Sequence, residues 1–277
     1  MNLSPLEIGA LLRAHRLQPK KGLGQNFLAD PVALERIVKA AEIMPEAHVL
    51  EIGPGLGSLT RYLARAARWV TAVELDQALL PVLQEVLAPF NNVRIVPGDI
   101  LKLDPAGLVP ESGYLVVANI PYYITSAVIR HLLETPVKPA RIVLTVQREV
   151  AERITAAPGK LSLLALSVQV YGLPSIAARI PAGAFYPPPK VDSAVVRVDL
   201  YPQPQIPRKQ LKTFFRLAKA GFGQKRKMLR NALAGGLGHQ HNQIEELLRT
   251  AGIDPQRRAE TLSMDEWRML TEEFVRE

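Results

Sequence analysis

The sequence predicts an α/β fold with a parallel sheet, followed by a small all-helical C-terminal domain. Between residues 49 and 147, short segments rich in apolar and β-branched residues alternate with helix-like segments, which is the pattern of repeated β–α–β units. Three prolines between residues 201 and 207 mark a linker, because proline disrupts both helices and sheet interiors. The segments beyond this linker have helical periodicity. We therefore expect two domains, at residues 1–202 and 203–277.

The predicted strands of the first domain are short runs dominated by Val, Ile and Leu and bounded by polar or turn-forming residues. In the second domain, apolar residues recur every three or four positions, as in amphipathic helices. The predicted strands are residues 49–52, 69–73, 93–96, 115–118, 142–146, 163–171 and 194–200, and the predicted helices are residues 210–220, 225–234, 243–251 and 264–275.

Composition excludes several classes of protein. Of the 277 residues, 48% are hydrophobic and 22% charged, which is typical of a globular chain and not of a disordered one. The absence of cysteine excludes disulfide scaffolds, cysteine-ligated zinc, iron–sulfur clusters and cysteine nucleophiles. No apolar run approaches the roughly 18 residues of a membrane span, so we expect a cytoplasmic protein without membrane association. His239 and His241 lack an evident third ligand, and we expect no metal.

Basic residues are concentrated near the start of the second domain. The chain carries a net charge of +8, and residues 208–230 contain nine basic side chains and no acidic one. A solvated helix face is one interpretation, but surface helices normally mix the two signs of charge. An unscreened basic row favours a nucleic-acid surface. The candidate RNA-binding residues are Lys225, Arg226, Lys227 and Arg230.

A glycine-rich turn follows the first predicted strand. Residues 51–57 read Glu-Ile-Gly-Pro-Gly-Leu-Gly, and such a turn between strand and helix lets the backbone approach a ligand closely. The dinucleotide fingerprint requires a third glycine at position 58 or 60, where the chain has Ser58 and Thr60. The remaining pattern resembles the turn of Rossmann-like class I S-adenosylmethionine methyltransferases. We therefore expect Gly53 and Gly55 to bind this cofactor.

Two further acidic residues come at the ends of the next two predicted strands. Glu74 is placed to accept hydrogen bonds from both hydroxyls of a ribose. Asp99 can accept from an adenine amino group, while Ile100 packs on the ring. Each acid alone is compatible with a solvated strand end, but their occurrence at successive strand ends favours a cofactor pocket.

Residues 119–122, Asn-Ile-Pro-Tyr, follow the fourth predicted strand. The side-chain oxygen of Asn119 and the carbonyl of Ile120 are suited to accept from an exocyclic amine and so release its delocalised lone pair. Pro121 fixes the turn, and Tyr122 offers a face on which an unstacked base can lie. We assign these four residues to the catalytic centre, with a plain turn as the alternative. Phe185 is a candidate second stacking residue, or else a core residue.

Taken together, the motifs resemble those of the ribosomal RNA adenine N6-dimethyltransferases, and specifically their bacterial small-subunit branch. The resemblance covers nearly the whole chain, although no single motif is specific. After Lys160 the chain lacks a few residues that the family usually has, including a Tyr-Gly pair, which leaves open the role of that loop in substrate contact. The similar segments are residues 20–28, 51–57, 74–76, 98–99, 119–122, 147–153, 185–193, 225–233 and 258–263.

The resemblance implies S-adenosylmethionine as cofactor and the transfer of four methyl groups to two adjacent adenosines in the 3′-terminal hairpin loop of 16S rRNA. The implied target is a precursor of the small ribosomal subunit, with a role in its biogenesis, and we expect a monomer. Residues 25–28 would close over the cofactor. Gln25 belongs to this closing segment and is counted among the cofactor-binding residues. The other contacts that the resemblance implies are Asn26, Leu28, Gly53, Glu74, Asp99 and Asn119.

Three alternatives share some of these motifs. A large-subunit rRNA methyltransferase of the macrolide-resistance type would have the same first domain, but residues 225–233 and 258–263 favour the small-subunit branch. A DNA adenine methyltransferase would more often have proline where this chain has Ile120. A non-catalytic assembly factor would bind through residues 208–230 and would be expected to have a degraded pocket, whereas the pocket residues here are intact.

Overall fold

The computed structural model describes residues 3–109, 112–120 and 124–276. The chain folds into two compact units. The first comprises Met1–Ala151 and Ser175–Leu200, and the second comprises Glu152–Pro174 and Tyr201–Glu277. The second unit therefore includes a segment that precedes the linker in sequence. The expected functional boundary after residue 202 stays a prediction.

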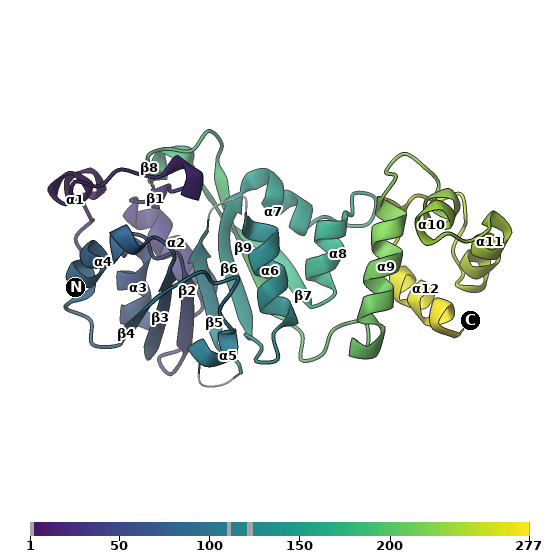
Figure 1. The fold of residues 1–277 in the computed structure, drawn as a ribbon, viewed down its shortest axis with the longest axis horizontal. Helices are drawn as coiled ribbons and strands as arrows, with labels where there is room; N and C mark the ends of the chain where they lie inside the picture. Colours follow the sequence, from purple (N-terminus) through teal and green to yellow (C-terminus); the bar gives the residue numbers. More distant parts are fainter. Residues whose placement is uncertain (1–2, 110–111, 121–123, 277) are drawn as a thin grey trace. The chain divides into compact units, whose positions relative to one another are not determined.

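The first unit is built on a seven-stranded sheet in the order β4-β3-β2-β5-β6-β9-β7 (Figure 1). The five strands from β4 to β6 are parallel, and β9 pairs antiparallel to β6. The strands are β2 (His48–Ile52), β3 (Trp69–Glu74), β4 (Val93–Pro97), β5 (Leu115–Asn119), β6 (Arg141–Gln147), β7 (Gly172–Ile180) and β9 (Ser193–Leu200).

The central strands are buried on both faces, as the unbroken apolar runs in their sequences require. This confirms the α/β fold and the six predicted strands at 49–52, 69–73, 93–96, 115–118, 142–146 and 194–200. The chain leaves β2 toward β3 on one side, while β5 lies on its other side. Such a reversal of strand order opens a crevice at the carboxyl ends of the strands, where ligands bind in folds of this type.

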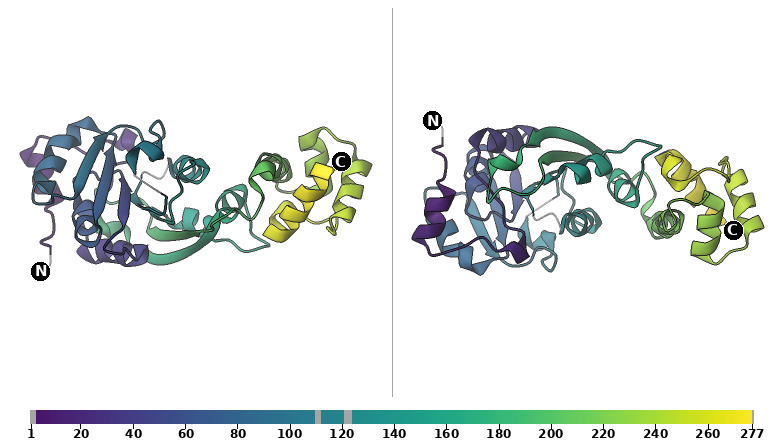
Figure 2. Two further views of the ribbon diagram at one scale, coloured as in Figure 1. Left: turned by 90° about the horizontal axis from the view of Figure 1, so that it is seen from below. Right: turned by 90° about the horizontal axis from the view of Figure 1, so that it is seen from above.

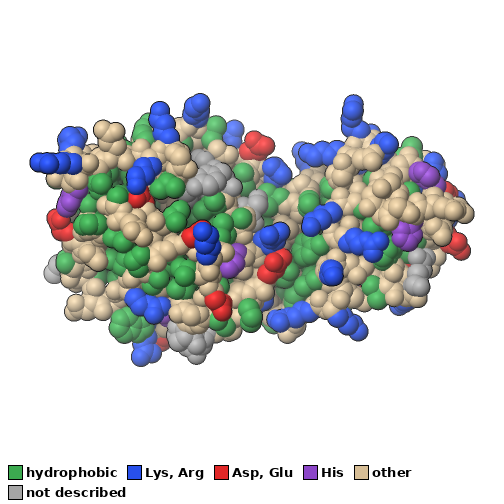
Figure 3. Space-filling model, in the orientation of Figure 1, with side chains coloured by type: hydrophobic (Ala, Val, Ile, Leu, Met, Phe, Trp, Pro, Cys, Tyr) green, Lys and Arg blue, Asp and Glu red, His purple; other side chains and the backbone are tan. Residues whose placement is uncertain are grey.

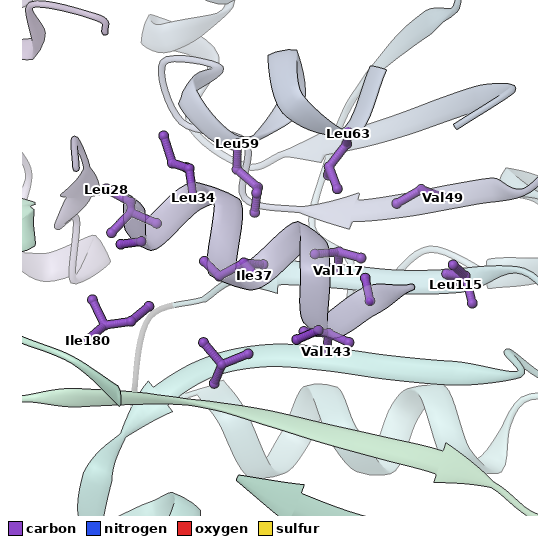
Figure 4. Close-up of a cluster of buried hydrophobic side chains, with 14 of the residues drawn as sticks. Leu28, Leu34, Ile37, Val49, Leu59, Leu63, Leu115, Val117, Val143 and Ile180 are labelled. Carbon is purple, nitrogen blue, oxygen red and sulfur yellow. The ribbon is translucent and has the colours of Figure 1, made fainter. Parts of the chain in front are cut away.

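One face of the sheet is covered by α2 (Pro31–Ala41) and α3 (Ser58–Ala66). Helix α2 begins with Asp30, whose carboxylate accepts from the Ala33 N–H, and with Pro31 in the first turn. Its apolar stripe buries Leu34 and Ile37, which lie together with Val117 and Val143 of the sheet (Figure 4). Burial of a Leu or Ile side chain of this kind contributes about 1.5–3 kcal/mol. The helix is thereby fixed against β5 and β6.

The remaining helices of this part of the chain lie between successive strands, except α1, which precedes the first strand. The β5-α6-β6 crossover runs across the sheet in the direction opposite to β2-α3-β3, so right-handed connections place α6 on the other face. These helices are α1 (Ile8–Ala14), α4 (Leu80–Leu87), α5 (Pro105–Leu108), α6 (Thr125–Glu134) and α7 (Arg148–Ile154), with single 3₁₀ turns η1 (Lys21–Leu23), η2 (Gln77–Leu79) and η4 (Ala182–Ala184).

Three features of the sheets differ from the sequence prediction. Residues 163–171 were expected as a strand but form helix α8 (Leu163–Gln169), because Ser162 caps its first turn through the Ala165 N–H and Leu and Ala favour a helix. Strand β7 escaped prediction, since it contains Pro174, which is tolerated at the edge of a sheet. A second sheet pairs β1 (Phe27–Leu28) with β8 (Phe185–Tyr186).

The second unit contains α8 and four further helices, which pack on one another (Figure 2). Its core is centred on Trp267 and Phe214, both fully buried. The all-helical character of the C-terminal region is thus confirmed. The helices are α9 (Leu211–Phe222), α10 (Leu229–Leu237), α11 (His241–Thr250) and α12 (Met264–Arg276), with 3₁₀ turns η5 (Arg208–Gln210) and η6 (Ala259–Thr261).

Helix α10 begins later than the sequence predicted. A helix was expected from residue 225, but Lys225–Lys227 lie in the turn between α9 and α10, and the helix starts at Leu229. Three consecutive cations are unfavourable at the positive N-terminal end of a helix and favourable just beyond the C-terminal end of another. The basic triplet therefore occupies an exposed turn.

Helices α9 and α10 approach closely at Gly236, which gives a prediction about stability. A Cβ atom built on Gly236 would lie 2.6 Å from the Cβ and 2.8 Å from the Cα of Ala220, so we expect Gly236→Ala to lower the free energy of unfolding by about 1–3 kcal/mol. The neighbouring Gly235→Ala is the control. A Cβ atom on Gly235 would meet only the Gln224 side chain, at 3.6 Å. Gly235→Ala should therefore raise the free energy of unfolding by up to about 1 kcal/mol, because alanine has the higher helix propensity. Urea unfolding of both variants measures this, and equal effects would contradict the close approach.

Candidate functional site

A cavity lies at the carboxyl ends of β2, β3, β4 and β5, where the strand order reverses. Each of these strands, or the turn that follows it, supplies at least one polar group to the wall. The N-terminal segment crosses the cavity and supplies the remaining wall. The polar and glycine lining residues that the sequence predicted are Gln25, Asn26, Gly53, Gly55, Glu74, Asp99 and Asn119, and Leu28, Ile100 and Ile120 line it as apolar groups.

The glycine-rich turn after β2 adopts a backbone that favours glycine. Gly53, Gly55 and Gly57 have φ angles of +71°, +59° and +84°, and Gly57 precedes the first residue of α3. A Cβ atom on Gly55 would lie 2.9 Å from the Phe27 ring. The absence of a side chain at Gly55 therefore lets the N-terminal segment pack directly on the turn.

Glu74 joins this turn to the end of β3. Its carboxylate accepts from the Gly55 N–H at 3.0 Å through Oε2 and from the Asp76 N–H at 2.7 Å through Oε1. The side chain is buried, and this burial raises its pKa, although the two N–H groups oppose the rise. Each oxygen accepts one backbone N–H and keeps a lone pair for a further donor, as the binding of a ribose diol requires.

Glu51 is a second buried carboxyl group in the cavity wall. It is 1% exposed, and its Oε2 has no hydrogen-bond partner within the described residues. Burial raises the pKa of Glu51 to about 8, and the nearby Glu74 carboxylate adds to this shift. The Oγ of Ser58 is also without a partner in the described chain and lines the same cavity. Two unsatisfied polar groups at one place leave hydrogen-bonding capacity for a ligand.

Asp99 and Ile100 follow β4 and line the same cavity. Oδ1 of Asp99 accepts from the Leu101 N–H at 3.0 Å, which holds the carboxylate in a tight turn. Ile100 is buried, but Leu75 on the adjacent strand end is 50% exposed and also lines the cavity. Leu75 and Ile100 are thus apolar groups in the wall of the cavity that also contains the Asp99 carboxylate. The sequence reasoning missed Leu75, although its position directly after Glu74 was a usable signal.

Asn119 ends β5 at the cavity. Its Nδ2 donates to the carbonyl of Asn26 at 3.2 Å, so the side-chain Oδ1 remains as an acceptor. Ile120 lies in the cavity wall and is buried. The other two residues assigned to the catalytic centre, Pro121 and Tyr122, lie outside the described residues. The described half of the motif is thus consistent with an acceptor aimed at an amine.

Phe185 has a different environment from the one its expected stacking role requires. It is 4% exposed and belongs to the hydrophobic cluster that includes Leu28 and Ile180. It does not line the cavity described above. The neighbouring Tyr186 is 43% exposed. Base stacking by Phe185 stays a prediction, and it requires the ring to leave the core.

The candidate RNA-binding residues fall into two environments. Lys225, Arg226 and Lys227 are exposed in the turn before α10, and the ion pairs within the described ranges include none of the three. Arg230 instead pairs with Glu245 of α11 at 3.2 Å. Figure 3 shows Lys and Arg side chains spread over the face of the second unit that is turned to the viewer. The exposed triplet is therefore better placed for phosphates than Arg230.

Comparison with known proteins identifies strong similarities. The family described as ribosomal RNA adenine dimethylase matches residues 16–275. A ribosomal RNA small subunit methyltransferase A from Dehalococcoides mccartyi is 49% identical, over 94% of this chain and 90% of that relative. Its namesake from Pelotomaculum thermopropionicum is 44% identical over 98% of this chain and 97% of its own.

Solved structures agree on the fold. The 23S rRNA methyltransferase ErmE superimposes with a TM-score of 0.73 at 30% identity, covering 90% of this chain and all of its own. A dimethyladenosine transferase from Plasmodium falciparum gives a TM-score of 0.75 at 24% identity, over 90% and 98% of the two chains, and this likeness concerns the fold alone. None of the helices in the described ranges is both long and apolar enough to cross a membrane.

The raised pKa of Glu51 predicts how stability depends on pH. In the unfolded chain this carboxyl group ionises near 4.5, whereas in the folded protein it keeps its proton up to about pH 8. The folded state thus binds more protons in between, and stability falls as the pH rises through this window. Glu51→Gln has no ionisable group at this position, so its free energy of unfolding should not show this fall. Relative to the wild type, the free energy of unfolding of the variant should therefore rise by up to a few kcal/mol between pH 5 and pH 8, at about 1.4 kcal/mol per pKa unit.

Urea unfolding at the two pH values measures this difference. Glu46→Gln, at an exposed position, is the matched control and should run parallel to the wild type. A Glu51→Gln variant that also runs parallel would show that Glu51 ionises normally in the folded protein.

Proposed function

Because the chain belongs to the ribosomal RNA adenine dimethylase family and is a methyltransferase, we propose that it transfers methyl groups from S-adenosylmethionine to N6 of two adjacent adenosines in the 3′-terminal hairpin loop of 16S rRNA. The observation that carries the proposal is Asn119, whose Nδ2 is held by Asn26 at the rim of a cavity lined by Glu74 and Asp99. This arrangement leaves Oδ1 as an acceptor for an exocyclic amine beside the cofactor pocket.

The residues present fit S-adenosylmethionine. The unpartnered oxygens of Glu51 and Ser58, on either side of the glycine turn, suit the amino-acid moiety. Glu74 has a free lone pair on each oxygen for the ribose. We assign the adenine to Asp99, Ile100 and Leu75, which line the same cavity. When bound, the cofactor supplies an electrophilic methyl group on its sulfonium. Gly53, Gly55, Asn26 and Leu28 line the rest of the pocket.

The chain's own contribution to the reaction is the holding of the target amine. An adenine N6 lone pair is delocalised into the ring, so the nitrogen is a poor nucleophile. We assign to the Oδ1 of Asn119 and the carbonyl of Ile120 the acceptance of hydrogen bonds from its N–H groups, which turns the nitrogen toward tetrahedral geometry. Tyr122 and Phe185 are the proposed stacking residues for the flipped base. The ammonium product is acidic enough to lose its proton to water.

The small-subunit RNA is the proposed substrate because relatives that are 44–49% identical over nearly the whole chain are named small-subunit methyltransferases. The second candidate is the large-subunit RNA, favoured by the 30% identity to ErmE. In our proposal, residues 1–202 carry catalysis and residues 203–277 bind RNA within a precursor of the small subunit. We further propose that the protein acts in the cytoplasm as a monomer and contributes to subunit assembly.

A methyl-transfer assay tests this function. Labelled S-adenosylmethionine is offered separately to undermodified small and large ribosomal subunits, and the product nucleoside is identified. We expect dimethyladenosine in the small-subunit RNA only. Label in large-subunit RNA only would replace the proposal with the second candidate, and binding without label in either would leave an assembly factor.

Substitution of Asn119, the proposed amine acceptor, tests the catalytic centre separately from RNA binding. We expect Asn119→Ala to reduce methyl transfer by on the order of 10²-fold or more, as loss of a preorganised polar group does at other reacting centres. Binding of the ribosomal particle should be nearly unchanged, because Asn119 is not proposed to contact phosphates. Asn91→Ala, at an exposed position, is the control and should retain full activity. Equal losses of transfer and of particle binding would remove Asn119 from the catalytic centre.

The two environments of the basic residues predict different effects. Lys225→Glu, Arg226→Glu and Lys227→Glu in one variant should weaken particle binding and flatten its salt dependence, by roughly one unit of slope per lost phosphate contact. Cofactor affinity should stay unchanged. Arg230→Gln should mainly lower stability, because it breaks the ion pair with Glu245. An unchanged salt slope in the triple variant would move the RNA surface to other residues.

A further inference from the structure

The segment at residues 20–28, hereafter the N-terminal cover, forms one wall of the cavity and is attached at both ends and in the middle. At its far end, β1 pairs with β8 and the Phe27 ring packs on Gly55. In its middle, the carbonyl of Asn26 accepts from Asn119. Its near end has no strand pairing and begins at Lys20, whose side chain is half exposed. What holds this end in place is a set of side-chain contacts to one carboxylate.

That carboxylate is Asp76, which lies beyond β3 and is 6% exposed. Its Oδ1 accepts from the Lys20 ammonium at 2.7 Å, and its Oδ2 accepts from the Gln25 Nε2 at 2.8 Å. The Gln25 Oε1 in turn accepts from the Lys20 backbone N–H at 2.7 Å. Burial raises the pKa of Asp76, but the bonds from Lys20 and Gln25 outweigh it and hold this pKa below its ordinary value. The charged form therefore carries the contacts.

The same residue is connected to the cofactor-binding carboxyl group. The Asp76 N–H donates to Glu74 Oε1 at 2.7 Å, while Asp76 Oδ1 also caps η2 through the Ala78 N–H at 3.1 Å. Both ends of the Gln25 carboxamide are used within this network. Its side chain therefore acts on the cover itself, and the expected contact of Gln25 with the cofactor stays a prediction.

We propose that Asp76, with Lys20 and Gln25, is a latch that holds the N-terminal cover closed over the cofactor cavity, and that Asp76 is a positioning residue for the reaction. The inference rests on the proposed function, since the cavity is taken to bind S-adenosylmethionine. With the latch formed, Asn26 stays where it orients the Asn119 amide. Without it, the near end of the cover is released, and the cavity loses one wall.

The hydrogen-bond pattern of the latch allows a test by rescue. Asp76→Asn keeps the shape and the cap on η2, but its new amide group faces the Gln25 amide, so one donor is left opposed to another. Gln25→Glu alone sets two carboxylates against each other. In the double variant, the carboxylate at position 25 accepts from both the Lys20 N–H and the new amide, while the Oδ1 at position 76 still accepts from the Lys20 ammonium. The pattern is thereby restored.

The measurement is the affinity for S-adenosylmethionine by calorimetry, together with amide hydrogen exchange of residues 20–28 with and without the cofactor. We expect each single variant to weaken binding about tenfold and to speed exchange in the cover, and the double variant to recover most of both. Asp104→Asn is the matched control, because Asp104 also caps a helix, through the Ala106 N–H at 3.0 Å, but lies outside the latch. Its affinity should equal that of the wild type.

The outcomes separate the latch from the proposed function. A wild-type protein that does not bind S-adenosylmethionine overturns the proposed function. A wild type that binds, with Asp76→Asn binding equally well, overturns the latch. The latch is also overturned if the losses of cofactor affinity in the two single variants add up in the double variant, or if they follow a lowered melting temperature of the free protein. Either result indicates general destabilisation instead of a specific hydrogen-bond pattern.

Discussion

The arrangement of the site depends on one buried carboxylate, that of Glu74. It accepts one backbone N–H from the glycine turn after β2 and another from Asp76 after β3. Two loops from adjacent strands are thereby held at a fixed separation. A buried carboxylate is costly unless it is hydrogen-bonded, so the turn and the strand end stabilise the charge that binds them together. Through Asp76 the same group is connected to the N-terminal cover.

Most of the cavity wall was predictable from sequence because of the geometry of parallel sheets. The carboxyl ends of parallel strands meet at one edge, so polar residues that directly follow buried strands must converge. On this ground the sequence alone predicts that Gly53, Glu74, Asp99 and Asn119 lie in one cavity. The fold class followed from the same alternation of apolar runs and helical segments.

What sequence reasoning could not supply depends on long-range contacts. The segment at 163–171 is apolar throughout, and such a run fits a strand or a helix until Ser162 is seen to cap its first turn. The assignment of Gln25 needed the position of Asp76, which lies 51 residues away in sequence. The pairing of Arg230 with Glu245 likewise arises from the packing of α10 on α11. Sequence motifs identify the candidate residues, but only the fold shows which of them already bind other side chains of the protein.

The two proposed binding functions place opposite demands on charge. The cavity is lined by Glu51, Glu74 and Asp99, and a polyanion such as RNA would be repelled by three ionised carboxylates. Burial lessens this conflict, because the raised pKa of Glu51 keeps that group neutral below about pH 8 and the raised pKa of Glu74 acts in the same direction. A cationic cofactor, in contrast, favours their ionised forms. A bound cation therefore promotes the ionisation of Glu51 and Glu74, and a neutral base edge is all that has to enter beside Asn119. The proposed phosphate contacts are the exposed cations at Lys225–Lys227, which lie in a different compact unit from these carboxylates.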